Sequence, residues 1–235
     1  VGTMVVAGVM LLRSGRHSET QTAAPALRIS TVTNRGTMNG AALSPDGRYV
    51  AYSMALGGDR TLWVRQLATG SDVQILPPQA VQPMGPVFTP DGNYLYYSSA
   101  DPDRDGYTAI FEVPSLGGTP RKRAYDVDTR ISFSPDGKQI CFGRGVPQKN
   151  RQDLVIRDLD RGQERVLASA ADPVTFVPGD LAWSPDGKSV AITETRGGVA
   201  SGSSVVAYRV KDGRREPIGK YSWLTVNDLA WLPDG

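Results

Sequence analysis

The sequence predicts an all-β protein, a β-propeller built from four-stranded antiparallel blades, and three observations lead to this prediction. A Ser/Thr-Pro-Asp-Gly turn, or a close copy of it, occurs five times, with its prolines at positions 45, 90, 135, 185 and 233. The steps between these prolines are 45, 45, 50 and 48 residues, and a fixed period in this range indicates a repeat architecture. Each complete repeat also holds enough β-rich segments for four strands, which is the content of one propeller blade.

The turn chemistry predicts a tight β-hairpin in each repeat. Proline pre-sets φ at the second position of a type I turn, aspartate tolerates the third, and glycine takes the left-handed conformation that reverses the chain. β-rich runs such as Tyr49 to Met54 and Tyr94 to Ser99 follow the turns, as a hairpin requires. The predicted structural turn residues are Pro45, Asp46, Gly47, Pro90, Asp91, Gly92, Pro135, Asp136, Gly137, Pro185, Asp186 and Gly187.

A third and a fourth strand complete each predicted blade. In the third segment the closing glycine always lies eight positions after the first apolar residue, as Gly70 does after Leu62, and a short strand follows. A β-sandwich is the alternative, but five matched turns at near-constant spacing disfavour it. The blades are expected around residues 34–76, 80–124, 128–168 and 179–218, with the start of a further blade at 226–235. That extra start predicts a ring of more than four blades.

The N-terminal residues indicate a membrane anchor. Residues 1–12, VGTMVVAGVMLL, carry no charge, but they are fewer than the roughly 20 residues that span a bilayer. We interpret them as the C-terminal part of a transmembrane helix; the core of a signal peptide and an artefact of preparation are the alternatives. Residues 13–26 are rich in Ser, Thr, Ala and Pro and predict a flexible linker. The propeller domain is then expected over 27–235, opening with a lone strand at Leu27 to Thr33.

Composition and motifs argue against several classes of function. The 26 Lys plus Arg against 24 Asp plus Glu give no reason to expect nucleic acid as a partner. The one histidine, His17, lies in the linker, so no Ser-His-Asp or Cys-His pair is expected in the folded region. One His and one Cys make zinc improbable. We therefore expect no catalytic residue, no metal and no cofactor in this segment, and a buried structural role for Cys141.

Two sets of carboxylates could suggest calcium, and both have a simpler interpretation. In a Pro-Asp-Gly turn the aspartate accepts hydrogen bonds from nearby backbone amides, so the turn aspartates need no metal to explain them. The segment Asp101 to Gly106 has carboxylates at alternate positions, as a calcium loop does, but Arg104 interrupts the EF-hand pattern. A strand also separates the loop from Glu112, which occupies the twelfth position. We therefore predict no metal in this loop either.

The loops that join strands two and three, and those that join successive blades, are the predicted binding surface. Propellers open these loops on one face, whereas the Pro-Asp-Gly turns lie on the other. Mixed charge with scattered aromatics suits a protein, peptide or glycan partner, and solvated loops without a ligand are the alternative. The candidate partner-binding residues are Arg60, Asp103, Arg104, Tyr107, Lys149, Arg151 and Phe176.

The repeat resembles a known bacterial family. Copies such as LSPDGRYVAYS resemble the TolB-like, WD-repeat-like propeller repeat, and the resemblance covers Leu27 to Gly235. More specifically, Leu62 to Pro78, Asp91 to Tyr97 and Leu116 to Lys122 resemble one architecture. In it, a cytoplasmic serine/threonine protein kinase domain is followed by one transmembrane helix and a propeller outside the membrane.

The resemblance implies a non-enzymatic sensor or protein-interaction propeller. It implies a single-pass protein of the bacterial inner membrane, anchored through residues 1–12, with the propeller on the periplasmic or extracytoplasmic side. Similar propellers occur in membrane-bound winged-helix transcriptional regulators. More distantly, the repeat resembles the substrate-gating propeller of prolyl-oligopeptidase-type serine hydrolases. Both architectures are alternatives for the parent protein.

Overall fold

The computed structural model describes residue 31 and residues 37–56, 59–79, 84–198, 202–226 and 228–232. The chain divides into two compact units, Val1–Thr33 and Asn34–Gly235, and the fold below is that of the second. The predicted membrane segment, the linker and, apart from Thr31, the predicted opening strand lie outside the described residues. Within the described part of the chain, no helix is long and apolar enough to cross a membrane.

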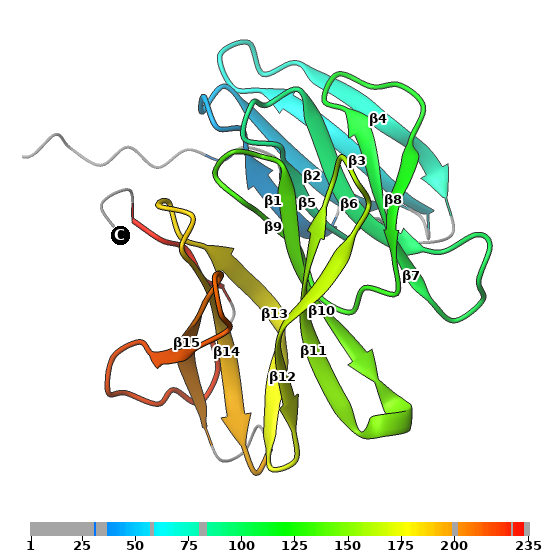
Figure 1. Cartoon of the computed structure of the whole chain (residues 1–235). Coiled ribbons are helices and arrows are strands. Elements are labelled where there is room, and N and C mark those ends of the chain that lie inside the picture. Colours follow the sequence, from blue (N-terminus) through cyan, green and yellow to red (C-terminus); the bar gives the residue numbers. More distant parts are fainter. Residues whose placement is uncertain are drawn as a thin grey trace, which may run out of the picture. The chain divides into compact units, whose positions relative to one another are not determined.

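The predicted fold class is confirmed: the described residues form a β-propeller of four antiparallel blades (Figure 1). Each blade has four strands that pair in sequence order, so every connection is local. Blade 1 holds β1 (Thr37–Leu43), β2 (Tyr49–Leu56), β3 (Asp59–Gln66) and β4 (Asp72–Gln79). Blade 2 holds β5 (Met84–Phe88), β6 (Tyr94–Ala100), β7 (Thr108–Pro114) and β8 (Arg121–Tyr125).

The second pair of blades repeats this arrangement. Blade 3 holds β9 (Ser132–Phe133), β10 (Gln139–Val146), β11 (Arg151–Asp158) and β12 (Glu164–Ala171), with the short 3-10 helix η1 (Pro147–Lys149) between β10 and β11. Blade 4 holds β13 (Val174–Trp183), β14 (Ser189–Arg196), β15 (Ser203–Arg209) and β16 (Arg215–Pro217). Trp231, beyond β16, donates a hydrogen bond from Nε1 to the carbonyl of Ala182 at 2.9 Å, so this segment packs on blade 4.

The hairpin turn between the first two strands is the same in all four blades. In blade 1 the amide of Gly47 donates to the carbonyl of Ser44 at 2.9 Å, and the amide of Ser44 donates to the carbonyl of Tyr49 at 2.8 Å. Gly47 has a φ of +69°, a conformation that glycine adopts without steric cost. The equivalent φ values are +73° at Gly92, +70° at Gly137 and +74° at Gly187.

The turn aspartate is held by the residue two positions before it. Ser44 donates from Oγ to Asp46 Oδ1 at 2.6 Å, and the amide of Arg48 donates to the same oxygen at 3.0 Å. These bonds favour the charged carboxylate and therefore lower the pKa of Asp46 below its ordinary value. The matching hydroxyl bonds run from Thr89 to Asp91, from Ser134 to Asp136 and from Ser184 to Asp186, at 2.5, 2.6 and 2.7 Å.

The lowered pKa values set the direction of the pH dependence. The pKa of Asp186 falls to about 2, chiefly because of the Ser184 hydroxyl, whereas an unfolded aspartate titrates near 4. A group whose pKa is lowered by folding stabilises the folded protein at pH values above the pKa that the group has in the unfolded chain. That contribution is lost as the pH falls towards the folded pKa. The Asp186 turn is therefore stabilised at neutral pH and weakens between about pH 4 and pH 2, and the other three turns weaken in the same direction as the pH falls.

Neighbouring turns pack directly on one another. A Cβ atom added to Gly92 would lie 3.8 Å from Cδ of Pro45, and one added to Gly137 would lie 3.4 Å from Cδ of Pro90. The same relation places Gly187 against Pro135, at 3.7 Å. Each of these three glycines thus faces the proline of the preceding blade, and the four turns form a continuous row.

The hydrophobic core lies between blades. Three clusters of buried side chains fill the three junctions between consecutive blades. Along β6, Leu95 and Tyr97 contribute to the junction with blade 1, whereas Tyr96 contributes to the junction with blade 3. This alternation follows from the two-residue period of a strand, and it explains why the central strands are apolar on both faces. Cys141 is fully buried in the junction between blades 3 and 4.

A pair of glycine substitutions tests this packing. Gly47 and Gly213 share a φ of +69°, but a Cβ atom on Gly47 would meet nothing within 4 Å, whereas one on Gly213 would lie 2.3 Å from the Leu167 carbonyl oxygen of blade 3. Gly47→Ala should therefore cost only the left-handed penalty of about 1–2 kcal/mol. Gly213→Ala should cost a further 1–3 kcal/mol or so, because the blades must move apart.

Urea unfolding of the two variants measures the difference, with Gly47→Ala as the matched control. Equal losses of unfolding free energy in the two variants would show that Gly213 of blade 4 is not in tight contact with the Leu167 carbonyl of blade 3.

Candidate binding surface

The blades present two different ends. We call the end with the turns between strands one and two and between strands three and four the turn face. The opposite end, which we call the loop face, carries the loops between strands two and three and the connections between blades. The sequence prediction placed the binding residues on the loop face.

Several predicted loop residues lie in regular structure instead. Arg60 is in β3, Arg151 begins β11 and Lys149 ends η1. The strands extend further than the sequence indicated, so the connecting loops are short.

The prediction for Phe176 is wrong. It lies in β13, is only 3% exposed and packs edge-to-face on Tyr208, with ring centres 5.9 Å apart. Its side chain belongs to the core cluster between blades 3 and 4 because β13 begins at Val174 and turns this position inward. Phe176 therefore cannot offer a surface to a partner.

Three of the predicted residues come together in the loop between β6 and β7. The amide of Asp101 donates to the carbonyl of Tyr107 at 2.8 Å and closes the loop. The amide of Asp103 donates to Asp101 Oδ1 at 3.0 Å. Lys122, on β8, donates from Nζ to Asp101 Oδ1 at 2.9 Å and also bonds Asp103 Oδ2. The loop is therefore fixed at its base and at its side.

Lys122 also explains the calcium-like pattern of this loop. Its ammonium group lies between the carboxylates of Asp101 and Asp103, the position that a cation would take. The hydrogen bond from Lys122 lowers the pKa of Asp101, which is only 5% exposed. No group of three or more His, Cys, Asp or Glu side chains suited to a metal ion occurs among the described residues.

The tip of this loop presents an arginine between two tyrosine rings. The guanidinium carbon of Arg104 lies 5.4 Å from the ring centre of Tyr107 and 5.1 Å from that of Tyr125, within the range of cation–π contacts. Tyr107 and Tyr125 are 46% and 47% exposed. We call Arg104, Tyr107 and Tyr125 the Arg104 platform. It is an exposed surface of the residue types that dominate protein interfaces.

Arg144 supports the platform from blade 3. Its guanidinium donates to the carbonyl of Tyr125 at 2.9 Å and to the carbonyl of Asp126 at 2.8 Å, and lies 5.6 Å from the Tyr125 ring centre. It also donates to Glu164 at 2.7 Å. Sequence reasoning missed Lys122, Tyr125 and Arg144, because their contacts depend on how β8 and β10 lie beside the loop.

A pocket of the loop face lies between blades 3 and 4 and has a volume of about 260 Å³. Arg151 and Gln152 line it, but both are engaged within the fold. Arg151 donates a hydrogen bond from Nη2 to Asp153 Oδ2 at 2.8 Å, and its Nε lies 2.8 Å from Asp153 Oδ1. Gln152 Oε1 accepts a hydrogen bond from the amide of Phe176 at 2.7 Å. The Arg151–Asp153 pair lies within β11, whereas the Gln152 bond joins blade 3 to blade 4.

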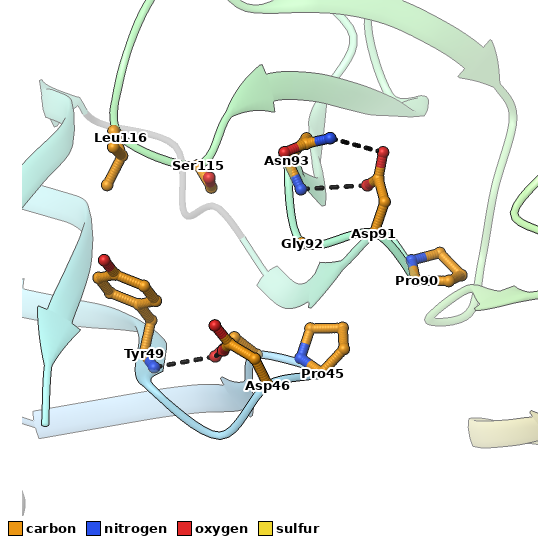
Figure 2. A pocket seen from close by; sticks show the side chains of 10 residues that line it. Pro45, Asp46, Tyr49, Pro90, Asp91, Gly92, Asn93, Ser115 and Leu116 are labelled. Carbon is orange, nitrogen blue, oxygen red and sulfur yellow. Dashed lines mark hydrogen bonds between the residues drawn. The ribbon is translucent and has the colours of Figure 1, made fainter.

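The turn face holds a larger groove, which the sequence did not predict. It has a volume of about 490 Å³ and lies between the first two Pro-Asp-Gly turns, beside Tyr49 and Leu116 (Figure 2). Asp46 and Asp91 both line it. Asn93 donates to Asp91 from its amide nitrogen at 3.1 Å and from its side chain at 2.8 Å, so this carboxylate is already engaged.

Other ionisable groups with shifted pKa values are structural. Tyr96 donates to Glu112 at 2.5 Å, and burial together with this carboxylate raises the pKa of Tyr96. In blade 4 the carboxylate of Glu194 accepts from Tyr208 and, at 2.8 Å, from Arg215. These carboxylates join strands of one blade.

Comparison with known families identifies the repeat. The family model described as PD40, TolB beta propeller domain, matches residues 20–198. Among curated proteins, the chain is 25% identical over 177 residues to a Bacillus subtilis (strain 168) protein named uncharacterized peptidase YuxL. The match covers 73% of this chain and 24% of that relative, so the chain spans about a quarter of the relative's length.

Solved structures show the same fold. TolB from Acinetobacter baumannii superposes with a TM-score of 0.62 at 20% identity, covering 77% of this chain and 43% of TolB. A puromycin-hydrolyzing peptidase from Mycobacterium tuberculosis superposes with a TM-score of 0.59 at 17% identity, covering 78% of this chain and 29% of the peptidase. At these identities the likeness concerns the fold alone.

A substitution of Lys122 tests the rigidity of the Arg104 loop. Lys122→Gln removes the cation between Asp101 and Asp103 and should loosen residues 101–107. Hydrogen–deuterium exchange at the amides of Asp103 and Tyr107 should become about tenfold faster, because local opening then costs less.

The control is Arg121→Gln, which changes an exposed cation on the same strand. If the exchange rates of residues 101–107 are unchanged in Lys122→Gln, or rise equally in both variants, the role given to Lys122 is contradicted.

Proposed function

Since the chain belongs to the family of TolB β-propeller domains, we propose that it serves as a non-enzymatic protein-interaction domain of a larger protein. The observation that carries the proposal is the Arg104 platform. Arginine and tyrosine are enriched among the residues that contribute most to binding energy at protein interfaces. Here they stand exposed on a loop that Lys122 and Arg144 hold in place.

The arrangement of ionisable groups supports a role in binding rather than in catalysis. The shifted carboxylates and tyrosines described above are engaged by neighbouring groups of the same fold, within turns or between strands. Asp46 and Asp91 line the turn-face groove, but hydroxyl and amide donors of their own turns engage them, whereas a catalytic group must be available to a substrate. The one histidine of the sequence, which could serve as a general base, lies at position 17, ahead of the propeller.

We further propose that the parent protein is a membrane-anchored serine/threonine protein kinase. Support comes from the sequence: the segments Leu62 to Pro78, Asp91 to Tyr97 and Leu116 to Lys122 resemble kinase-linked propellers, and residues 1–12 have the composition of a membrane anchor. In this arrangement the propeller lies on the extracytoplasmic side of the bacterial inner membrane. Its occupancy by a partner regulates a kinase domain on the cytoplasmic side. A membrane-bound winged-helix regulator would use the propeller in the same way.

A serine hydrolase is the second candidate for the parent protein. The observation that favours it is the likeness to two proteins named as peptidases, one from Bacillus subtilis and one from Mycobacterium tuberculosis. In such a parent the propeller would control access to a hydrolase domain, and its own surface would contact that domain.

The protein expressed from the complete gene distinguishes these candidates. We expect it to transfer phosphate from ATP to itself or to a generic protein substrate, and to leave aminoacyl p-nitroanilides intact. The control is the same protein with alanine in place of the kinase catalytic-loop aspartate, which should abolish transfer.

Hydrolysis of the anilides that disappears on replacing a serine in a downstream Gly-x-Ser-x-Gly segment would overturn the sensor proposal and favour the hydrolase.

A further inference from the structure

We propose that the Arg104 platform binds a single carboxylate side chain of its partner, an aspartate or glutamate with apolar or aromatic neighbours. This inference rests on the proposed interaction function and names the chemistry that the surface recognises.

The first argument concerns the unused donors of Arg104. Tyr107 and Tyr125 lie over its guanidinium at 5.4 and 5.1 Å, so contacts to the ring faces are already made. Among the described residues, no hydrogen bond or ion pair from this guanidinium occurs, in contrast to Arg144 and Arg151. A guanidinium has five N–H donors in its plane, and a carboxylate matches two of them in parallel. The free edge of Arg104 is therefore suited to a planar anion.

The second argument concerns preorganisation. The backbone of the loop is closed by the bond between Asp101 and Tyr107, and a further bond runs from the amide of Tyr107 to the carbonyl of Arg104 at 3.2 Å. Arg144 fixes the backbone of Tyr125 on the other side. A partner that binds a surface already held in its bound form loses less conformational entropy. The cation–π contacts restrict the long Arg104 side chain in the same way.

The third argument concerns the charges around the platform. Lys122 bonds both Asp101 and Asp103 and so balances the charge of one of these two carboxylates; Arg144 bonds Glu164 and lies 3.6 Å from the carboxylate of Asp126. Among the described residues Arg104 has no hydrogen bond or ion pair with a carboxylate, and the exposed residue Asp105 follows it in the sequence. A single carboxylate can therefore pair with the free edge of Arg104, whereas a polyanion such as nucleic acid or a phosphorylated lipid would meet the surplus of carboxylates around the platform.

The half-exposed tyrosine rings define the neighbours of that carboxylate. Each tyrosine is about half exposed and so offers both apolar ring surface and a polar end to a partner. Apolar or aromatic side chains beside the carboxylate would cover these faces and exclude water from the ion pair. A peptide segment with one acidic residue between apolar residues meets all three conditions.

Two capped pentapeptides test the proposal on the full chain in mild detergent: acetyl-Gly-Phe-Glu-Phe-Gly-amide and the same peptide with glutamine in the centre. Binding is followed by NMR, through the amide signals of Asp101 and of residues 103–107 and the Nε–H signal of Arg104. We expect the glutamate peptide to bind about five- to tenfold more tightly than the glutamine peptide, because the neutral glutamine cannot form an ion pair with Arg104. Arg104→Gln should remove this preference.

Arg60→Gln is the matched control, because it deletes another loop-face cation, in blade 1, and should leave the preference unchanged. Equal affinity for the two peptides, an Arg104→Gln variant that keeps the preference, or no binding of either peptide would each overturn the inference. Tighter binding of inorganic phosphate than of acetate at the Arg104 Nε–H would overturn it too, by favouring a phosphate site. None of these results bears on whether the parent protein is a kinase or a hydrolase, so the proposed function is judged separately.

Discussion

The hydrogen bond from a serine or threonine hydroxyl to the aspartate two residues later holds each hairpin turn, and the row of blades depends on it. In blade 1 the hydroxyl of Ser44 donates to Asp46 and also accepts from the amides of Arg48 and Tyr49, at 3.1 and 2.8 Å. One hydroxyl thus satisfies the groups that the chain exposes where it reverses. Because the turn keeps one shape, the proline of each turn meets the glycine of the next, and consecutive blades are spaced alike.

This regularity separates the two faces of the protein. On the turn face, the polar groups of the repeat are engaged in the turns, and the groove beside Asp46 and Asp91 is lined by carboxylates that already have donors. On the loop face the repeat does not dictate the sequence, and side chains there can be directed outward. Arg104 is such a side chain: its loop is anchored by Lys122 on the sheet, while its guanidinium points to tyrosine rings and solvent. The rigid turns therefore support a surface that is free to recognise a partner.

The architecture could be predicted from sequence because the turn chemistry is local. Pro-Asp-Gly fixes the hairpin, the spacing counts the blades, and apolar strands predict that both faces of a blade are covered. The site could be predicted only in part. Arg104 and Tyr107 stand in a loop with evident charge, but the contacts from Lys122 and Tyr125 reach across strands and have no sequence signature. Phe176 was misplaced because the sequence does not show that β13 begins at Val174, inside the segment predicted as a loop, and in that strand the ring faces the core.

The most direct test of this account is an NMR titration of the four turn aspartates in the folded chain, with and without Ser134→Ala. The account predicts that Asp46, Asp91, Asp136 and Asp186 all titrate below the ordinary aspartate pKa. In Ser134→Ala only Asp136 should return towards its ordinary pKa, because its hydroxyl donor is gone. Ordinary pKa values in all four turns, or an Asp136 that is indifferent to the loss of Ser134, would show that the hydroxyl–carboxylate bond does not hold the turns.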